Sequence, residues 1–155
     1  MKIVISVCHG GFNLSKRAVT RLAELNGQTA YFFKEEFGRG LSIIYVPTSL
    51  DSEEDLFWSA FVVPNPNEVL GRYDWKKMTD DQKQNYNDNY KKFHFSHRDI
   101  PRSDPKLIQV VGELGEAANG RFAELRIVEI PDGVEYEIEE YDGREWISEK
   151  HRTLS

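Results

Sequence analysis

The segment Ile3-Val4-Ile5-Ser6-Val7-Cys8-His9-Gly10-Gly11-Phe12-Asn13-Leu14-Ser15 decides how this chain begins to fold. Its first five residues form an apolar run typical of a buried strand, and Gly10-Gly11 ends that run just before a helix start. Such a bend brings bare backbone N–H groups and a reactive thiol to one place, which is where α/β proteins often hold anionic ligands. We therefore expect a binding site at this bend.

Capping signals predict three helices. Ser15 is a suitable N-cap for the first helix. Thr79 and Gln82 have the spacing of a capping box, which predicts a second, polar helix. Asp104 followed by Pro105 is typical of the start of a third helix, because the missing N–H of proline costs nothing there. The first and third helices carry apolar stripes and are expected to pack on a sheet.

The strands predict the fold class. Apolar runs near residues 3–7, 31–33, 41–46, 56–63 and 125–130 read as strands, and residues 134–151 read as a hairpin folded at Asp142-Gly143. We predict an α+β (α/β-like) fold of a single domain over residues 1–155. In it a mixed sheet with a C-terminal hairpin carries two main packed helices. Residues 65–103 form a polar helical insertion or lid, whose aromatic side chains are expected to pack rather than bind.

Two strand registers are possible for the hairpin, depending on the length of its turn. A two-residue turn sets Glu140 directly against Glu145, and like charges in that position repel. A three-residue turn with a glycine bulge pairs Glu140 with Arg144 and Ile138 with Trp146, so we predict this register. It gathers apolar side chains on one face and leaves glutamates on the other. The apolar face then holds Val134, Tyr136, Ile138 and Trp146, and the acidic face Glu135, Glu137, Glu139, Glu145 and Glu149.

Composition excludes several classes of function. The chain has 155 residues and a net charge of −6, which argues against binding to duplex nucleic acid but not against a small phosphate-bearing ligand. Its single cysteine excludes an intramolecular disulfide and a C-x-x-C metal pair, so we expect no metal and no cofactor. No apolar run reaches the roughly 20 residues of a membrane span, so a cytoplasmic protein is expected. The sequence leaves a homo-oligomer open.

Parts of the chain resemble a family of small uncharacterised proteins from bacteriophages and bacteria. The resemblance lies in residues 127–146 and 149–153, in the turn 8–12 and in Asp104-Pro105-Lys106-Leu107. It covers about half of the chain, whereas residues 31–97 look peculiar to this protein. The resemblance brings no activity with it. It implies a phage or prophage setting, with the host cytoplasm as compartment, in which small accessory proteins often act on host defence or nucleotide metabolism.

These observations point to a non-catalytic protein that binds a small nucleotide-like or ADP-ribose-like ligand and sequesters a host defence signal. Backbone donors and a hydroxyl would hold phosphate, arginines would supply charge, and Phe12 or Trp146 would stack on a base. The candidate ligand-binding residues are Cys8, His9, Gly10, Gly11, Phe12, Ser15, Arg98, Arg102, Trp146, His151 and Arg152.

Two other classes stay open. A small enzyme acting on nucleotides or on an acyl or glycosyl bond would use Cys8 as nucleophile, with His151 or another histidine as base, or a glutamate of the hairpin as general base. An acidic decoy would use the glutamate face of the hairpin to bind a host protein. Each candidate also has a purely structural interpretation. The glycines would make a tight turn, Cys8 would be a small core residue, and Arg98 and Arg102 would neutralise the acidic hairpin.

Overall fold

The computed structural model describes residues 1–37, 43–50, 57–71 and 75–150. Helices and small antiparallel sheets make up the described chain, which confirms the α+β class. The chain forms two compact units, residues 1–25 with 97–155 and residues 26–96. That the whole chain is one domain, with residues 65–103 as a lid, stays a prediction. Among the described residues, no helix combines the length and apolar character that a membrane span needs.

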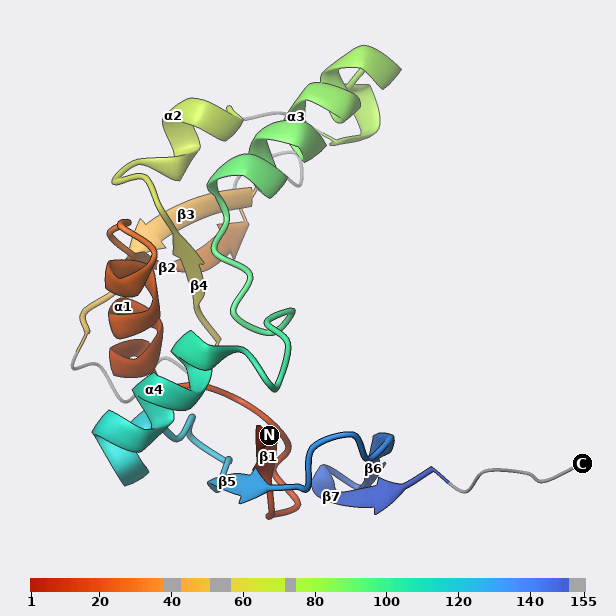
Figure 1. Ribbon diagram of the computed structural model, residues 1–155. Coiled ribbons are helices and arrows are strands. Elements are labelled where there is room, and N and C mark those ends of the chain that lie inside the picture. The colour runs from red at the N-terminus through yellow and green to blue at the C-terminus, as the bar shows by residue number, and fades with distance from the viewer. Residues whose placement is uncertain (38–42, 51–56, 72–74, 151–155) are drawn as a thin grey trace, which may run out of the picture. The chain divides into compact units, whose positions relative to one another are not determined.

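The first unit is built on a two-stranded antiparallel sheet of β1 (Lys2–Ser6) and β5 (Leu125–Glu129). Helices α1 (Lys16–Leu25) and α4 (Pro105–Leu114) contact each other, and α4 contacts both strands (Figure 1). A short helix, η3 (Gly115–Ala118), continues α4. Apolar residues of both helices are buried, so the two packed helices predicted from the stripes are confirmed.

The predicted caps explain where these helices begin. Ser15 Oγ accepts a hydrogen bond from the Ala18 amide over 3.1 Å, as an N-cap does. Asp104 Oδ1 accepts from the amides of Lys106 and Leu107 over 2.8 and 3.2 Å. Each cap satisfies N–H groups that have no partner within the first turn of a helix.

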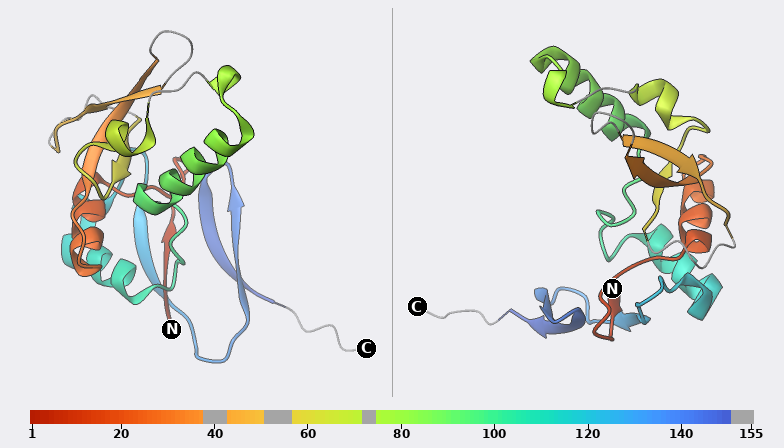
Figure 2. Two further views of the ribbon diagram at one scale, coloured as in Figure 1. Left: turned by 90° about the horizontal axis from the view of Figure 1, so that it is seen from above. Right: turned by 180° about the vertical axis from the view of Figure 1, so that it is seen from behind.

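A hairpin of β6 (Tyr136–Tyr141) and β7 (Arg144–Glu149) completes the first unit. Figure 2 shows β5, β1, β7 and β6 side by side in that order. The strands β1 and β5 pack one face against the hairpin through a cluster of apolar side chains. That cluster contains Ile3, Ile5, Ile130, Val7, Val128, Tyr136, Ile138 and Ile147.

The predicted hairpin register is wrong. The turn has two residues, Asp142 at φ 49° and Gly143 at φ 86°, the positive values that a type I′ turn requires. Glu140 therefore lies opposite Glu145, and Glu139 opposite Trp146. The expected repulsion is avoided because Glu145 pairs with an arginine outside the hairpin and Glu140 accepts from the Gly143 amide over 2.7 Å.

The change of register also reverses which side chains of β7 face the body. Ile147 lies opposite Ile138 and joins the apolar cluster, a place that we expected Trp146 to fill. Trp146 is 42% exposed and its indole N–H donates to Glu139 Oε2 over 2.8 Å. Glu145, expected on the solvated face, is only 8% exposed.

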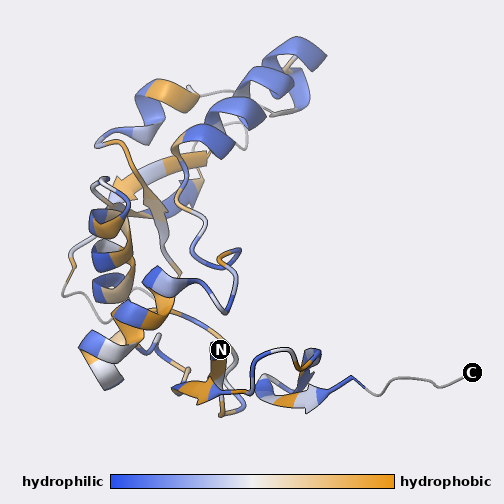
Figure 3. Ribbon diagram, viewed as in Figure 1, coloured by the Kyte–Doolittle hydropathy of each residue, from blue (hydrophilic) through white to orange (hydrophobic). Residues whose placement is uncertain are grey.

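The second unit has its own sheet and core. The strands pair antiparallel in the order β3-β2-β4, so the expected single mixed sheet is wrong: the described strands form three separate antiparallel sheets. Tyr86, Tyr90 and Phe93 of the polar helix pack against the core of this unit, as expected, while the rest of that helix is hydrophilic (Figure 3). The elements are β2 (Tyr31–Phe37), β3 (Ile43–Pro47), β4 (Ser59–Phe61), α2 (Pro66–Leu70), η2 (Trp75–Lys77) and α3 (Asp80–Phe93).

Helix α3 begins with the predicted capping box. The Gln82 amide donates to Thr79 Oγ1 over 3.2 Å, and the Thr79 amide donates to Gln82 Oε1 over 3.0 Å.

Replacing Gly143 by alanine tests how tightly the hairpin turn is held. A Cβ there would lie 2.2 Å from the His9 carbonyl oxygen, in addition to the strain of φ 86°. We expect Gly143→Ala to cost about 3 kcal/mol or more in the free energy of unfolding. Gly133→Ala is the matched control, because Gly133 has φ 81° but nothing within 4 Å of its added Cβ, and it should cost about 1 kcal/mol. Equal losses in urea unfolding would contradict the close packing of the turn.

The buried phenol of Tyr45 makes stability depend on alkaline pH. Burial chiefly, and then the neighbouring Tyr86 and Glu35, raise the pKa of Tyr45 above its ordinary value. Above about pH 10 the unfolded chain loses this proton while the folded chain keeps it, so stability falls as pH rises. Tyr45→Phe should therefore lose less stability than the wild type between about pH 9 and 11 in urea unfolding. Parallel losses over that range would contradict the assignment.

Candidate functional site

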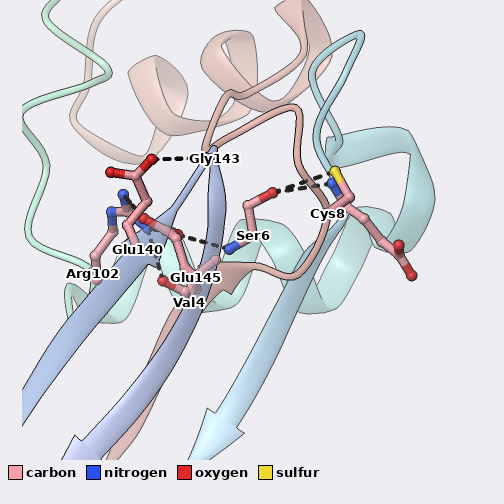
Figure 4. Close-up of polar contacts among 8 residues, drawn as sticks. Val4, Ser6, Cys8, Arg102, Glu140, Gly143 and Glu145 are labelled. Atoms are coloured by element: carbon pink, nitrogen blue, oxygen red, sulfur yellow. Dashed lines mark hydrogen bonds and ion pairs between the residues drawn. The ribbon is translucent and has the colours of Figure 1, made fainter.

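A buried ion pair joins the hairpin to the rest of the first unit. Arg102 donates from Nη1 to Glu145 Oε1 over 2.8 Å and from Nη2 to Oε2 over 2.9 Å. The Ser6 amide also donates to Glu145 Oε1 over 2.8 Å (Figure 4). Hydrogen bonds between charged groups are roughly twice as strong as neutral ones, and the bidentate geometry also fixes the orientation of both side chains. Arg102, predicted to bind a phosphate, therefore binds a carboxylate of the protein itself. This agrees with the purely structural interpretation, in which Arg102 neutralises the acidic hairpin.

Further contacts fix the Arg102 guanidinium. Its Nη1 donates to the Val4 carbonyl over 3.3 Å, and its Cζ lies 3.5 Å from the centroid of the Phe12 ring. The Val4 amide in turn donates to the Arg102 carbonyl over 3.0 Å. Phe12, expected to stack on a base, thus already carries a guanidinium on one face.

The diglycine bend is explained by close backbone packing. A Cβ on Gly10 would lie 1.6 Å from the Phe122 carbonyl oxygen, so only glycine fits there. Gly11 has φ 81° and its amide donates to the Cys8 carbonyl over 3.5 Å. Its neighbour across the bend is Gly143 of the hairpin turn, whose absent Cβ leaves room for the backbone of residues 9–11. The bend thus needs its glycines for packing, and a role in binding phosphate stays a prediction.

Ser15 and Cys8 are both engaged with backbone groups. Ser15 Oγ donates to the Ala117 carbonyl over 2.6 Å while it caps α1. Cys8 Sγ donates to the Phe122 carbonyl over 2.8 Å. The same sulfur lies 3.8 Å from Ser6 Oγ (Figure 4). Neither side chain is aimed at an anion in this arrangement.

The histidine and arginine candidates do not converge on Cys8. The ring of His9 is exposed, and its Nδ1 lies 3.3 Å from the Asp142 carbonyl oxygen. Arg98 is exposed and takes no part in the ion pair of Arg102. His151 and Arg152 lie outside the described residues.

An open groove of about 640 Å³ lies in the first unit between the β1–β5 sheet and the hairpin. Its apolar lining comes from Ile5, Val7, Val128 and Ile147, which belong to the apolar cluster between the β1–β5 sheet and the hairpin. The volume lies within the range of small-molecule sites, which is about 300–1,000 Å³. The groove therefore has the size of a small-molecule site.

The polar lining of the groove consists of cationic and aromatic side chains and of one acidic residue, Glu145, which pairs with Arg102. His9, Arg126 and Arg144 lie in its wall together with the rings of Tyr141 and Trp146. Among the described residues, neither Arg126 nor Arg144 has a carboxylate within ion-pair distance. Arg126 lies opposite Ile5 in the sheet, on the same face as the apolar cluster. Two arginines without a carboxylate partner in the described part of the chain are unusual in a protein of net charge −6.

Three of these groove residues were missed in the sequence. Side chains of a strand alternate between its two faces, so Arg126 shares a face with the apolar Val128 and Ile130. An arginine on an apolar face is the sequence signal that could have identified it. Arg144 and Tyr141 flank the turn, and only the two-residue register brings them opposite each other. The structure brings His9 and Trp146 of the predicted set into this groove. Among the described residues, no group of three or more His, Cys, Asp or Glu could hold a metal ion.

The ion pair can be tested by its contribution to stability. Arg102→Ala leaves the Glu145 carboxylate buried with only the Ser6 amide as partner, and it should cost about 3 kcal/mol. Arg98→Ala, in the same segment but exposed, should change the free energy of unfolding by less than about 0.5 kcal/mol. Urea unfolding measures both, and equal effects would show that the pair is not a stabilising contact.

Comparison with known proteins adds no assignment. No family model matches the chain, no curated protein matches it, and no solved structure is similar to it. A function for this chain therefore has to be argued from its own residues.

Proposed function

We propose that the groove of the first unit binds a small anionic, nucleotide-like or ADP-ribose-like ligand without transforming it. The single observation that supports this most is the pair of arginines, Arg126 and Arg144, that line the groove with no carboxylate partner among the described residues. Guanidinium groups recognise phosphate through paired N–H donors. An anion bound in the groove would accept hydrogen bonds from both guanidinium groups.

The rest of the lining fits the other half of such a ligand. Tyr141 is 73% exposed and Trp146 42% exposed, so both rings can accept a planar base. Stacking of a base on an aromatic side chain is worth roughly 1–3 kcal/mol. Compared with the prediction from sequence, the proposal keeps the ligand class, retains His9 and Trp146, and exchanges the diglycine bend and Arg102 for Arg126 and Arg144.

The enzyme alternative has less support. The thiol of Cys8 donates to a backbone carbonyl, and the one histidine adjacent to it contacts a different carbonyl. A nucleophile of this kind needs a base within hydrogen-bond reach. The decoy alternative also has less support, because Glu145, one of the glutamates of the expected acidic face, is buried in the ion pair. Sequestration of a host signal remains the biological role that we propose, on the resemblance to phage proteins.

Calorimetric titration with cyclic nucleotides and ADP-ribose derivatives tests the proposal. Arg126→Met and Arg144→Met should each weaken binding about tenfold or more, because a hydrogen bond to a charged group is worth roughly 1.5–3 kcal/mol. Lys91→Met removes the same charge from exposed α3 and should leave the affinity unchanged. Cys8→Ser should also bind normally.

Two results would contradict the proposal. Folded wild-type protein that binds no member of the panel would exclude this ligand class. Turnover of a bound nucleotide that disappears in Cys8→Ser would instead favour the enzyme alternative.

A further inference from the structure

We propose that Arg102 determines the specificity of the groove for anions by masking the charge of Glu145. The inference rests on the proposed function, because it concerns how the same groove accepts an anion. Arg102 would then be a specificity-determining residue that never touches the ligand.

The need for a mask follows from the position of Glu145. Glu145 is one of the groove-lining residues, and it stands between Arg144 and Trp146 in the sequence of β7. An uncompensated carboxylate there would repel a phosphate several ångströms away. At a distance of about 8 Å and an intermediate dielectric, one charge changes an affinity roughly three- to tenfold.

The geometry of the pair suits masking rather than binding. Arg102 engages both oxygens of Glu145 with Nη1 and Nη2, and it is not itself among the groove-lining residues. The ring of Phe12 and the carbonyl of Val4 hold the guanidinium where it is. The charge of Glu145 is thus neutralised by Arg102, while Arg102 itself offers no donor to a ligand in the groove.

A purely structural pair makes a different prediction. If the pair only held the hairpin in place, losing either partner would loosen the groove and weaken every ligand. If the pair also determines the net charge of the groove wall, removing Arg102 weakens anion binding and removing the charge of Glu145 strengthens it. The sign of the effect therefore separates the two roles.

The experiment is a charge cycle on the pair. Relative to the wild type, Arg102→Met changes the local charge by minus one, Glu145→Gln by plus one, and the double variant by zero. We expect Arg102→Met to weaken and Glu145→Gln to strengthen binding of ADP-ribose roughly three- to tenfold, with the double variant within about twofold of the wild type. Binding of adenosine, which is uncharged, should not follow this order.

Two matched controls carry the same charge changes elsewhere in the first unit. Lys2→Met on β1 and Glu149→Gln on β7 alter exposed residues that do not line the groove, so neither should reproduce the effect. Circular dichroism and urea unfolding check that each variant folds. If Arg102→Met does not fold, Glu145→Gln and the double variant still decide the sign.

The outcomes separate this inference from the proposed function. Wild-type protein that binds neither ADP-ribose nor any other member of the panel overturns both. Wild-type binding with Glu145→Gln weakened toward ADP-ribose and adenosine alike overturns the mask alone and leaves a structural pair. Opposite signs for the two single variants toward ADP-ribose support it.

Discussion

The structure of the first unit depends on one buried carboxylate. Glu145 comes from β7, its two principal partners come from the segment before α4 and from β1, and it is almost fully removed from water. A buried charge without a partner costs several kcal/mol, so Arg102 and the Ser6 amide have to be in place when the hairpin docks. Three segments far apart in the sequence are thereby fixed at one point. Arg102 also holds the edge of β1 that does not pair with β5. The Val4 amide donates to the Arg102 carbonyl, and the Arg102 guanidinium donates to the Val4 carbonyl.

This constraint also explains the glycines around it. With β7 held beside β1, the hairpin turn meets the bend that follows β1, and the backbones approach too closely for side chains. Gly143 and Gly10 are the residues that make this approach sterically allowed, each against a carbonyl group of a neighbouring loop. The bend that looks like an anion site in the sequence is thus first of all a packing junction. The groove lies next to it and uses the side chain of His9 from the same bend.

Local signals were enough to predict much of the fold and little of the site. The caps at Ser15, Thr79 and Asp104 were predictable because each depends on a few consecutive residues. The hairpin register was not, since the repulsion of Glu140 and Glu145 is relieved by Arg102, 43 residues away from Glu145. The same long-range contact decides which face of β7 is inward. The site depends on that choice and on the pairing of β1 with β5, so composition and spacing alone could not assemble it.

The charge of the chain as a whole differs from the charge inside the groove. A net charge of −6 disfavours the long-range attraction of extended polyanions such as a nucleic acid duplex. A small anion is different, because over a few ångströms the two arginines of the groove outweigh distant carboxylates that are screened by salt. Neutralising Glu145 inside the wall leaves those arginines as the dominant local charges. On the proposed function, the two arginines of the groove let an acidic protein select a small phosphate-bearing molecule over a longer nucleic acid.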